Sequence, residues 1–283
     1  MSLFCCPLCA APLSRGERAY ACPGGHSFDR AREGYVHLLP VSQKHSRSPG
    51  DDREMARARS RFLDGGWYAP LRRALCDLAL EHTGAAPAVL DAGCGEGYYT
   101  AGIHAALEQA GRSPRTAGVD LSKFALRRAA RRAPGAEFAV ASVYRLPVAD
   151  AAADLLVDCF SPLALEEFRR VLRPGGVFLY VVPAPEHLWE LKRVLYDTPY
   201  LNPDEAVPYG GFEYLDIVPV EGRMALSGPE AMDLFRMTPY CWKTPRAGVE
   251  RLAALEALEV GMAFRIHVFR RGGPSALVQK FLP

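Results

Sequence analysis

Several features that would place the protein in a membrane or outside the cell are missing from the sequence. No apolar run approaches the roughly 18 residues that a helix needs to cross a bilayer. No charged N-terminal region precedes an apolar core of the kind that signal peptides carry. The sequence also has no internal repeat and no low-complexity tract. We therefore expect a cytoplasmic, globular protein that does not associate with membranes.

A disulfide framework is also missing, although the chain has eight cysteines. Three cysteines lie among the first nine residues, whereas Cys76, Cys94, Cys159 and Cys241 are scattered among apolar residues. Evenly spaced cysteines are typical of secreted disulfide scaffolds, and a tight cluster is typical of a metal site. The cysteine spacing therefore predicts a bound metal near the N-terminus.

The composition is that of a folded protein with more than one unit. Apolar residues make up 49% of the 283 residues and charged residues 23%, which is enough material for a buried core. Proline and glycine break up residues 1–40, and residues 42–52 are polar. We predict a small cysteine-bearing module at residues 1–40, a linker and charged helix at 41–62, and a large domain at 63–283.

The large domain alternates short apolar runs with helical patterns, which is typical of a parallel sheet covered by helices. The helices are predicted around 54–63, 123–132, 186–195, 229–235 and 247–258. A last strand at 263–269 is expected antiparallel at the sheet edge. The parallel strands are predicted at Ala88–Ala92, Thr116–Asp120, Glu137–Ala141, Ala153–Cys159 and, after a Pro-Gly-Gly turn, Val177–Val182.

Four residues near the N-terminus have the spacing of a zinc site. Two residues separate Cys6 from Cys9, and three separate Cys22 from His26. Zn²⁺ favours thiolate and imidazole ligands in a tetrahedron, and each pair can converge from one tight turn. Four protein ligands predict a structural ion that stabilises a segment too small to fold unaided. The two-residue gap favours Cys6, while a Cys5 and Cys9 pair is also sterically possible.

A glycine-rich loop, Asp91-Ala92-Gly93-Cys94-Gly95-Glu96-Gly97, follows the first predicted strand. Doubly wound sheets bind nucleotide-like ligands at this place. A dinucleotide fold would carry GxGxxG, whereas here the pattern is GxGxG with Asp91 two residues ahead of it. A carboxylate there suits a cationic ligand better than a pyrophosphate. Asp120, at the end of the second strand, can accept both ribose hydroxyls of an adenosine.

This combination resembles the class I, Rossmann-like, seven-stranded methyltransferases over residues 86–185. The resemblance implies an α/β fold that binds S-adenosylmethionine, with a small zinc-binding domain ahead of it. On the residues alone, we predict cofactor contacts at Asp91, Gly93, Gly95, Gly97 and Asp120.

The motifs CPLC, CPGGH, FDRAREGYVHLLP, SPGDDREM, DGGWYAPL and DAGCGEGYYT together resemble one family. They are similar to the bacterial 23S ribosomal RNA (guanine-N1)-methyltransferases, which modify a guanine in a hairpin. The resemblance implies zinc at Cys6, Cys9, Cys22 and His26, a homodimer, and a zinc module that helps to grip RNA. It also implies cofactor contacts at Tyr68, Gly95, Glu96, Gly97 and His187.

The expected reaction needs mainly alignment of the acceptor nitrogen behind the S-methyl bond. Guanine N1 is protonated at neutral pH and lies on the Watson–Crick edge, so the base must be unpaired and a proton acceptor should help. The sequence identifies no such acceptor, and the catalytic residues stay unassigned. Phe160-Ser161-Pro162 is either a base-contacting turn or a plain one. The candidate phosphate ligands are Arg15, Arg18, Arg30, Arg32, Lys44, Arg47, Arg57, Arg59 and Arg61.

Two alternative functions are consistent with the same residues. The protein could methylate a small metabolite in a closed pocket, or it could be a non-enzymatic zinc and nucleotide binding module. Salt dependence separates RNA binding from small-molecule binding, and methyl transfer to ribosomal RNA would exclude the non-enzymatic module.

Overall fold

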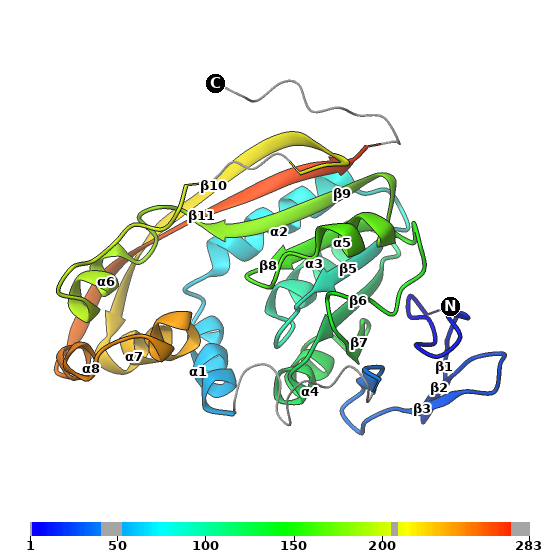
Figure 1. Ribbon diagram of the computed structural model, residues 1–283, viewed down its shortest axis with the longest axis horizontal. Coiled ribbons are helices and arrows are strands. Elements are labelled where there is room, and N and C mark those ends of the chain that lie inside the picture. The colour runs from blue at the N-terminus through cyan, green and yellow to red at the C-terminus, as the bar shows by residue number, and fades with distance from the viewer. Residues whose placement is uncertain (1, 41–52, 205–208, 273–283) are drawn as a thin grey trace.

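The computed structural model describes residues 2–40, 53–204 and 209–272 of the chain. The predicted polar linker at 42–52, with Lys44 and Arg47, lies outside the described residues. Within them, no helix is both long and apolar enough to cross a membrane. The described chain forms one large mixed sheet with helices around it, and a small three-stranded sheet near the N-terminus (Figure 1).

The large sheet has eight strands in the order β10-β11-β9-β8-β5-β6-β7-β4. Its central strands pair in parallel, while β11 is antiparallel to both of its neighbours. The fold is therefore that of a class I methyltransferase, extended by the short strand β4. The strands are β4 (Val36–His37), β5 (Ala88–Ala92), β6 (Arg115–Asp120), β7 (Glu137–Val140), β8 (Ala153–Cys159), β9 (Leu172–Pro183), β10 (Phe212–Ser227) and β11 (Ala257–Arg271).

Helices cover both faces of this sheet, because its central strands are mostly apolar and buried on both sides. On one face, α2 and α3 pack with α6 and α7 in the largest apolar core. On the other, α5 packs against β8 and β9, next to the N-terminal segment. The helices are α1 (Arg53–Asp64), α2 (Ala69–His82), α3 (Tyr98–Gln109), α4 (Lys123–Arg132), α5 (Leu165–Val171), α6 (Trp189–Leu195), α7 (Gly228–Met237) and α8 (Arg246–Ala253), with a 3₁₀ turn, η2 (Pro239–Trp242).

The five predicted parallel strands are confirmed, but the C-terminal part of the prediction was partly wrong. The helix predicted at 247–258 ends at Ala253, and residues 257–271 form a strand, β11. This strand is not at the sheet edge, because β10 pairs along its full length. Strand β10 was not predicted, because charged and apolar residues are mixed along its solvent-facing side. The helix predicted from 186 begins only at Trp189, since Leu188 has a φ of 56°.

The N-terminal segment packs directly against the large sheet. Its small sheet consists of β1 (Ser14–Arg15), β2 (Ala19–Ala21) and β3 (Ser27–Asp29), and the buried side chains of Phe4 and Tyr20 lie beside it. Phe4 forms a β-bridge with Val148 of the large domain. Further along the segment, β4 pairs in parallel with β7. The cysteine-bearing segment therefore shares both a core and a strand with the rest of the fold.

Candidate cofactor and metal sites

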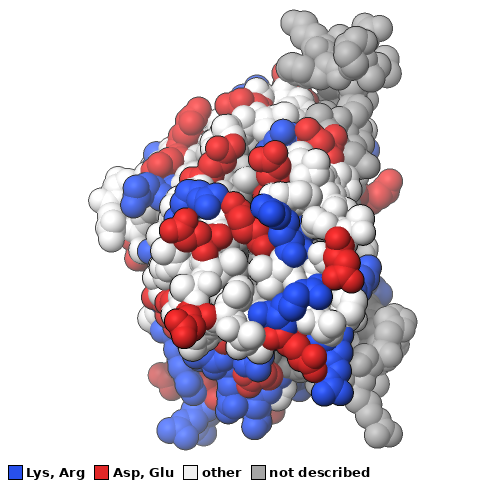
Figure 2. All heavy atoms as spheres, turned by 90° about the vertical axis from the view of Figure 1, so that its left-hand side faces the viewer, with Lys and Arg blue, Asp and Glu red and all other residues white. Residues whose placement is uncertain are grey.

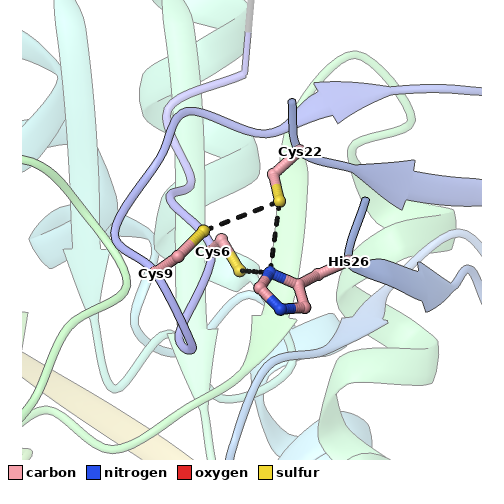
Figure 3. A group of neighbouring side chains, drawn as sticks. All are labelled: Cys6, Cys9, Cys22 and His26. Carbon is pink, nitrogen blue, oxygen red and sulfur yellow. Dashed lines mark hydrogen bonds between the residues drawn. The ribbon is translucent and has the colours of Figure 1, made fainter. Parts of the chain in front are cut away.

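Cys6, Cys9, Cys22 and His26 come together at one point, as Figure 3 shows. Two tight turns position them, because Ala10 N donates to Cys6 O at 2.8 Å and Gly25 N donates to Cys22 O at 3.0 Å. Each turn places two ligands on the same side of the chain. All four ligand atoms lie within 4.8 Å of one another.

The distances between these atoms fit a tetrahedral zinc ion. With Zn–S bonds of about 2.3 Å and Zn–N bonds of about 2.0 Å, a regular tetrahedron sets two sulfurs about 3.8 Å apart and sulfur and nitrogen about 3.5 Å apart. The Sγ atoms of Cys9 and Cys22 are 3.7 Å apart. Nδ1 of His26 lies 3.5 Å from the Sγ of Cys6 and 3.4 Å from that of Cys22. The donor set therefore suits Zn²⁺ in a closed, structural site.

The thiols are free to act as ligands. All eight cysteines of the chain are unbridged. Cys5, the alternative to Cys6, lies outside the four-residue group and is buried, which raises the pKa of its thiol. For Cys22, burial also raises the pKa, but hydrogen bonds from His26 and Cys9 outweigh burial and lower the pKa to about 7. The structure therefore assembles the Cys6 register rather than the Cys5 register.

The three glycines of the loop after β5 have left-handed backbones but different surroundings. A Cβ atom on Gly93 would lie 2.2 Å from Cβ of Ser161, and one on Gly97 would lie 2.9 Å from Cα of Ala129 in α4. Gly95 has a φ of 53° and nothing within 4 Å of a built Cβ, and it lines a cavity. Gly93 and Gly97 thus permit close packing, while Gly95 leaves room for a ligand against the backbone.

Asp91 lies buried beneath this loop with half of its carboxylate unpaired. Its Oδ2 accepts a hydrogen bond from Oγ1 of Thr100. Its Oδ1 has no hydrogen-bond partner among the described residues, and the residue is only 2% exposed, so water does not readily reach this oxygen. Burial raises the pKa of Asp91 to about 7, and Asp120 adds to the effect. An unpaired buried carboxylate beside an open cradle fits a cationic ligand such as S-adenosylmethionine.

Asp120 and Glu96 also line the cavity, but they hold different partners. Asp120, at the end of β6, accepts from the backbone N–H groups of Gly95 at 3.0 Å and Ser122 at 2.7 Å. Glu96 accepts from Oγ of Ser60 in α1 and from Arg132 in α4 at 2.6 Å. The Glu96 carboxylate therefore ties α1 and α4 to the glycine loop, and the Asp120 carboxylate fixes the shape of the loop itself.

Tyr68 and His187 are distant in sequence and meet at the cavity wall. Their ring centroids are 6.3 Å apart, and both rings contact Phe264 of β11. Burial, together with the nearby cation of Lys192, lowers the pKa of His187 to about 3. Nδ1 of His187 accepts from Ala263 N at 3.2 Å, so the neutral ring carries its proton on Nε2.

The turn that follows β8 is held in a strained shape. Asp158 is fully buried and accepts from Ser161 N at 2.9 Å, and Oγ of Ser161 donates to Ala92 O at 2.9 Å. Phe160 has a φ of 66°, a left-handed conformation that a bulky residue rarely adopts. Its ring is 49% exposed and lines the cavity. Burial raises the pKa of Asp158 to about 7.

One cavity of about 750 Å³ connects the glycine loop, the β8 turn and the β11 wall, whereas the zinc ligands, Asp91, Gly97 and Asp158 do not line it. Of the predicted contacts, its wall holds Tyr68, Gly93, Gly95, Glu96, Asp120 and His187. It lies at the carboxyl ends of β5, β6, β8 and β9, where doubly wound folds bind their ligands. Several of its wall residues were not among the contacts predicted from the sequence. These residues are Tyr99, Ala141 to Tyr144, Asn202, Met237 to Tyr240, and Trp242.

Comparisons with known proteins match the zinc segment and the cofactor domain to two separate families. Residues 4–47 match a zinc-ribbon family described as "RlmA, N-terminal", and residues 89–176 match a "Methyltransferase domain" family. The YcgJ protein from Bacillus subtilis superimposes with a TM-score of 0.51 and 17% identity, covering 71% of this chain and 99% of that protein. At this identity the likeness shows the fold alone. The zinc ribbon and the methyltransferase fold make Zn²⁺ and S-adenosylmethionine the cofactors.

Three relatives extend the comparison along the chain. The 23S rRNA (guanine(748)-N(1))-methyltransferase of Streptomyces fradiae is 43% identical over 66% of this chain, and the match spans 65% of that relative's length. A protein of Micromonospora griseorubida, named as a 23S rRNA (guanine-N(1)-)-methyltransferase, is 38% identical over 94% of this chain and 96% of its own. YxjB of Bacillus subtilis, named for the same activity, is 32% identical over 92% and 94%.

Replacing a ligand cysteine should lower zinc binding, whereas replacing a cysteine outside the ligand set should not. We expect Cys9→Ser to lower bound zinc from about one ion per chain to well below one half, and to lower the thermal midpoint. A structural zinc ion can contribute on the order of 10 kcal/mol to folding of its module. The matched control is Cys5→Ala, which should keep full zinc. Metal analysis and thermal denaturation measure both, and a full zinc load in Cys9→Ser would rule out this ligand set.

Substituting Gly95 should remove cofactor binding with little loss of stability. Gly95→Ala places a methyl group in the open cradle and strains a left-handed backbone by about 1–2 kcal/mol. We expect affinity for S-adenosylmethionine to fall at least about ten-fold.

The matched control is Gly111→Ala at the end of α3, where φ is 74° and the surrounding space is also open. It should show the same strain in thermal denaturation with unchanged calorimetric affinity. Equal affinities for the two variants would remove Gly95 from the cofactor site.

Cofactor affinity should depend on pH through Asp91. With a pKa of about 7, the carboxyl is largely protonated below neutral pH, and a cationic ligand requires its ionised form. We expect the dissociation constant to rise as pH falls from about 7, approaching ten-fold per pH unit, and to be flat above about 8.

The substitution Asp91→Asn should abolish this slope. The other buried carboxyl with a pKa of about 7 provides the control, and Asp158→Asn should retain the slope. If only Asp158→Asn lost the slope, the titrating group would be Asp158, and the prediction for Asp91 would be wrong. Isothermal calorimetry at several pH values measures the dissociation constant of each variant for S-adenosylmethionine.

Proposed function

The chain belongs to the family of 23S rRNA (guanine-N1)-methyltransferases, and from this membership we propose that it methylates N1 of a guanine in 23S ribosomal RNA. One observation carries the proposal. A relative named for this activity matches 94% of the chain, so the likeness includes the zinc segment as well as the methyltransferase domain. A small-metabolite enzyme or a non-enzymatic module would not require that zinc segment.

Each candidate site residue then has a proposed role. Cys6, Cys9, Cys22 and His26 bind the structural zinc ion. S-adenosylmethionine supplies a methyl group that its sulfonium already activates. Tyr68 and His187 bind it from the wall formed with β11, and Asp91 stabilises its positive charge. Asp120 holds the loop and accepts the ribose hydroxyls, and Gly95 gives the loop its open cradle. Gly93, Glu96 and Gly97 contact the cofactor from the same loop, which they also keep packed against its neighbours.

The rest of the cavity is proposed to receive the target base. N1 lies on the Watson–Crick edge of guanine, so the base must leave its stack before its N1 can face the methyl group. Exposed aromatic side chains line this part of the cavity, and Trp242 is 68% exposed. Phe160 and Tyr144 are the other two exposed rings. Rings of this kind stack on unpaired bases, and the fixed turn at Phe160 keeps one of them oriented for that contact.

Basic side chains outside the cavity are proposed to bind the RNA backbone. Figure 2 shows basic side chains gathered toward the lower end of the face that it presents, with acidic side chains among them. Arg57 of α1 is exposed, as are Arg127 and Arg131 of α4, which form ion pairs with Glu33. Phosphate contacts of this kind position a nucleic acid without reading its sequence.

The domain organisation, the form of the substrate and the assembly are also proposed. We propose a zinc module at residues 1–40, a linker and helix at 41–62, and the methyltransferase domain at 63–283. The two family matches, at 4–47 and 89–176, support such a division. The substrate is proposed to be a hairpin, since a loop presents an unpaired guanine. We further propose a homodimer that acts in the cytoplasm, where ribosomal RNA is assembled.

Methyl transfer to ribosomal RNA tests the function directly. We expect the purified protein to transfer a labelled methyl group from S-adenosylmethionine to 23S rRNA, and Gly95→Ala to do so poorly. Primer extension should stop beside one guanine, because a methyl on N1 blocks base pairing. RNA binding should weaken about ten-fold or more between about 50 and about 200 mM salt, as phosphate contacts require. No transfer to any RNA, or salt-independent binding, would refute the proposal.

A further inference from the structure

Lys192 of α6 is a fully buried lysine that the proposed mechanism does not yet use. Its Nζ donates to Tyr200 O at 2.9 Å and to Oδ1 of Asn202 at 2.7 Å. The rings of Tyr200 and Tyr240 lie 4.6 and 5.5 Å from the same atom. Among the described residues no carboxylate forms an ion pair with it, and burial lowers its pKa. Burial of an ammonium without a counter-ion is costly, so we expect Lys192 to stabilise or orient a neighbouring group.

The contacts of Lys192 fix the side-chain amide of Asn202. Besides accepting from Lys192, Asn202 donates through Nδ2 to Ala184 O at 2.9 Å, and its backbone N–H donates to Pro185 O at 2.9 Å. The amide therefore cannot rotate without losing two hydrogen bonds. One N–H of Nδ2 has no hydrogen-bond partner among the described residues.

This fixed amide lies in the wall of the cavity, next to the carboxyl end of β9. The turn with Phe160 follows the neighbouring strand β8, and both Phe160 and Asn202 line the same space. Tyr180 of β9 and Tyr240 of η2 complete this side of the wall. Asn202 is thus placed where a base entering the cavity would present its edge.

The chemistry of guanine methylation explains why a polarised donor belongs there. The methyl C–S bond breaks with its electron pair left on sulfur, the N1 lone pair forms the new C–N bond, and the N1 proton is released to solvent. As N1 loses its proton, negative charge spreads to O6 of the guanine. A donor held at O6 before the reaction stabilises that charge, and each such donor contributes roughly 10² to 10³ in rate.

We propose that Asn202 donates its remaining amide hydrogen to O6 of the target guanine, and that Lys192 is a positioning residue that fixes and polarises this amide. The inference rests on the proposed function and names the group that recognises its substrate. The buried cation draws electron density toward Oδ1, which makes the N–H a stronger donor. Adenine carries an amino group in place of O6, so the same donor would also reject adenine.

Asn202 is the only asparagine in the chain, which allows a direct measurement. Selective labelling with side-chain ¹⁵N asparagine gives one pair of amide signals. We expect these signals to stay in place when S-adenosylhomocysteine is added, and one proton to move downfield when a hairpin RNA with the target guanine follows. The same hairpin with adenine in that position is the control and should leave the signal unmoved. A shift with S-adenosylhomocysteine alone would assign Asn202 to the cofactor site and overturn the proposal.

Kinetics provide the second test. Asn202→Asp keeps the shape and the contact with Lys192 but loses both amide donors, the one to Ala184 O included, so kcat should fall roughly 10²-fold. KM for RNA and affinity for S-adenosylmethionine should change less than about two-fold. The pH at which kcat is half-maximal should rise, because O6 is no longer stabilised. A merely structural asparagine would not move this pH.

Lys192→Met separates positioning from folding, since replacing a buried charge by an apolar side chain is often neutral for stability. We expect kcat to fall about ten-fold or more with the same rise in the pH profile. Arg193→Met, an exposed position on the same helix, is the matched control and should behave as wild type. Wild-type rates in Asn202→Asp would overturn this inference, whereas absence of RNA methylation by the wild-type protein would overturn the proposed function.

Discussion

The parallel pairing of β5 with β6 and β8 is the constraint on which the rest of the site depends. Every residue of β5 is buried, so the strand can only lie in the middle of the sheet. Because its neighbours run in the same direction, the segments after three strands meet at one edge. The glycine loop, Asp120 and the turn at Phe160 are neighbours in space for this reason alone. Their side chains are then oriented by contacts among these three segments, such as Ser161 with Ala92 and Gly95 with Asp120.

Much of this arrangement could be predicted because its causes are local in the sequence. Apolar runs fix the buried strands, alternating glycines require left-handed backbone, and ligand pairs in tight turns define the metal cluster. The long hairpin of β10 and β11 was only partly predictable, because one face of β10 is exposed and its residues alternate irregularly. Tertiary pairing along fifteen positions stabilises a strand that its own residues do not specify.

The parts of the site that could not be predicted come from contacts between distant segments. Nothing in the sequence around Glu96 indicates that Ser60 and Arg132 would bind its carboxylate. The same is true of Asn202, whose place in the cavity depends on Lys192 and Ala184. His187 and Tyr68 are predicted to contact the cofactor only through resemblance, and the structure shows that both rings pack against Phe264. Such residues belong to irregular segments, where periodicity carries no signal.

The short strand β4 has a consequence beyond the cofactor cavity. It lies along the outer side of β7, whose backbone groups would otherwise face solvent as an open sheet edge. At the opposite edge, β10 presents charged side chains such as Glu213, Glu221 and Arg223, which discourage pairing with another chain. The β7 edge depends instead on the N-terminal segment staying folded. Metal loss would therefore uncover a template for strand addition, so zinc also protects the protein against edge-to-edge aggregation.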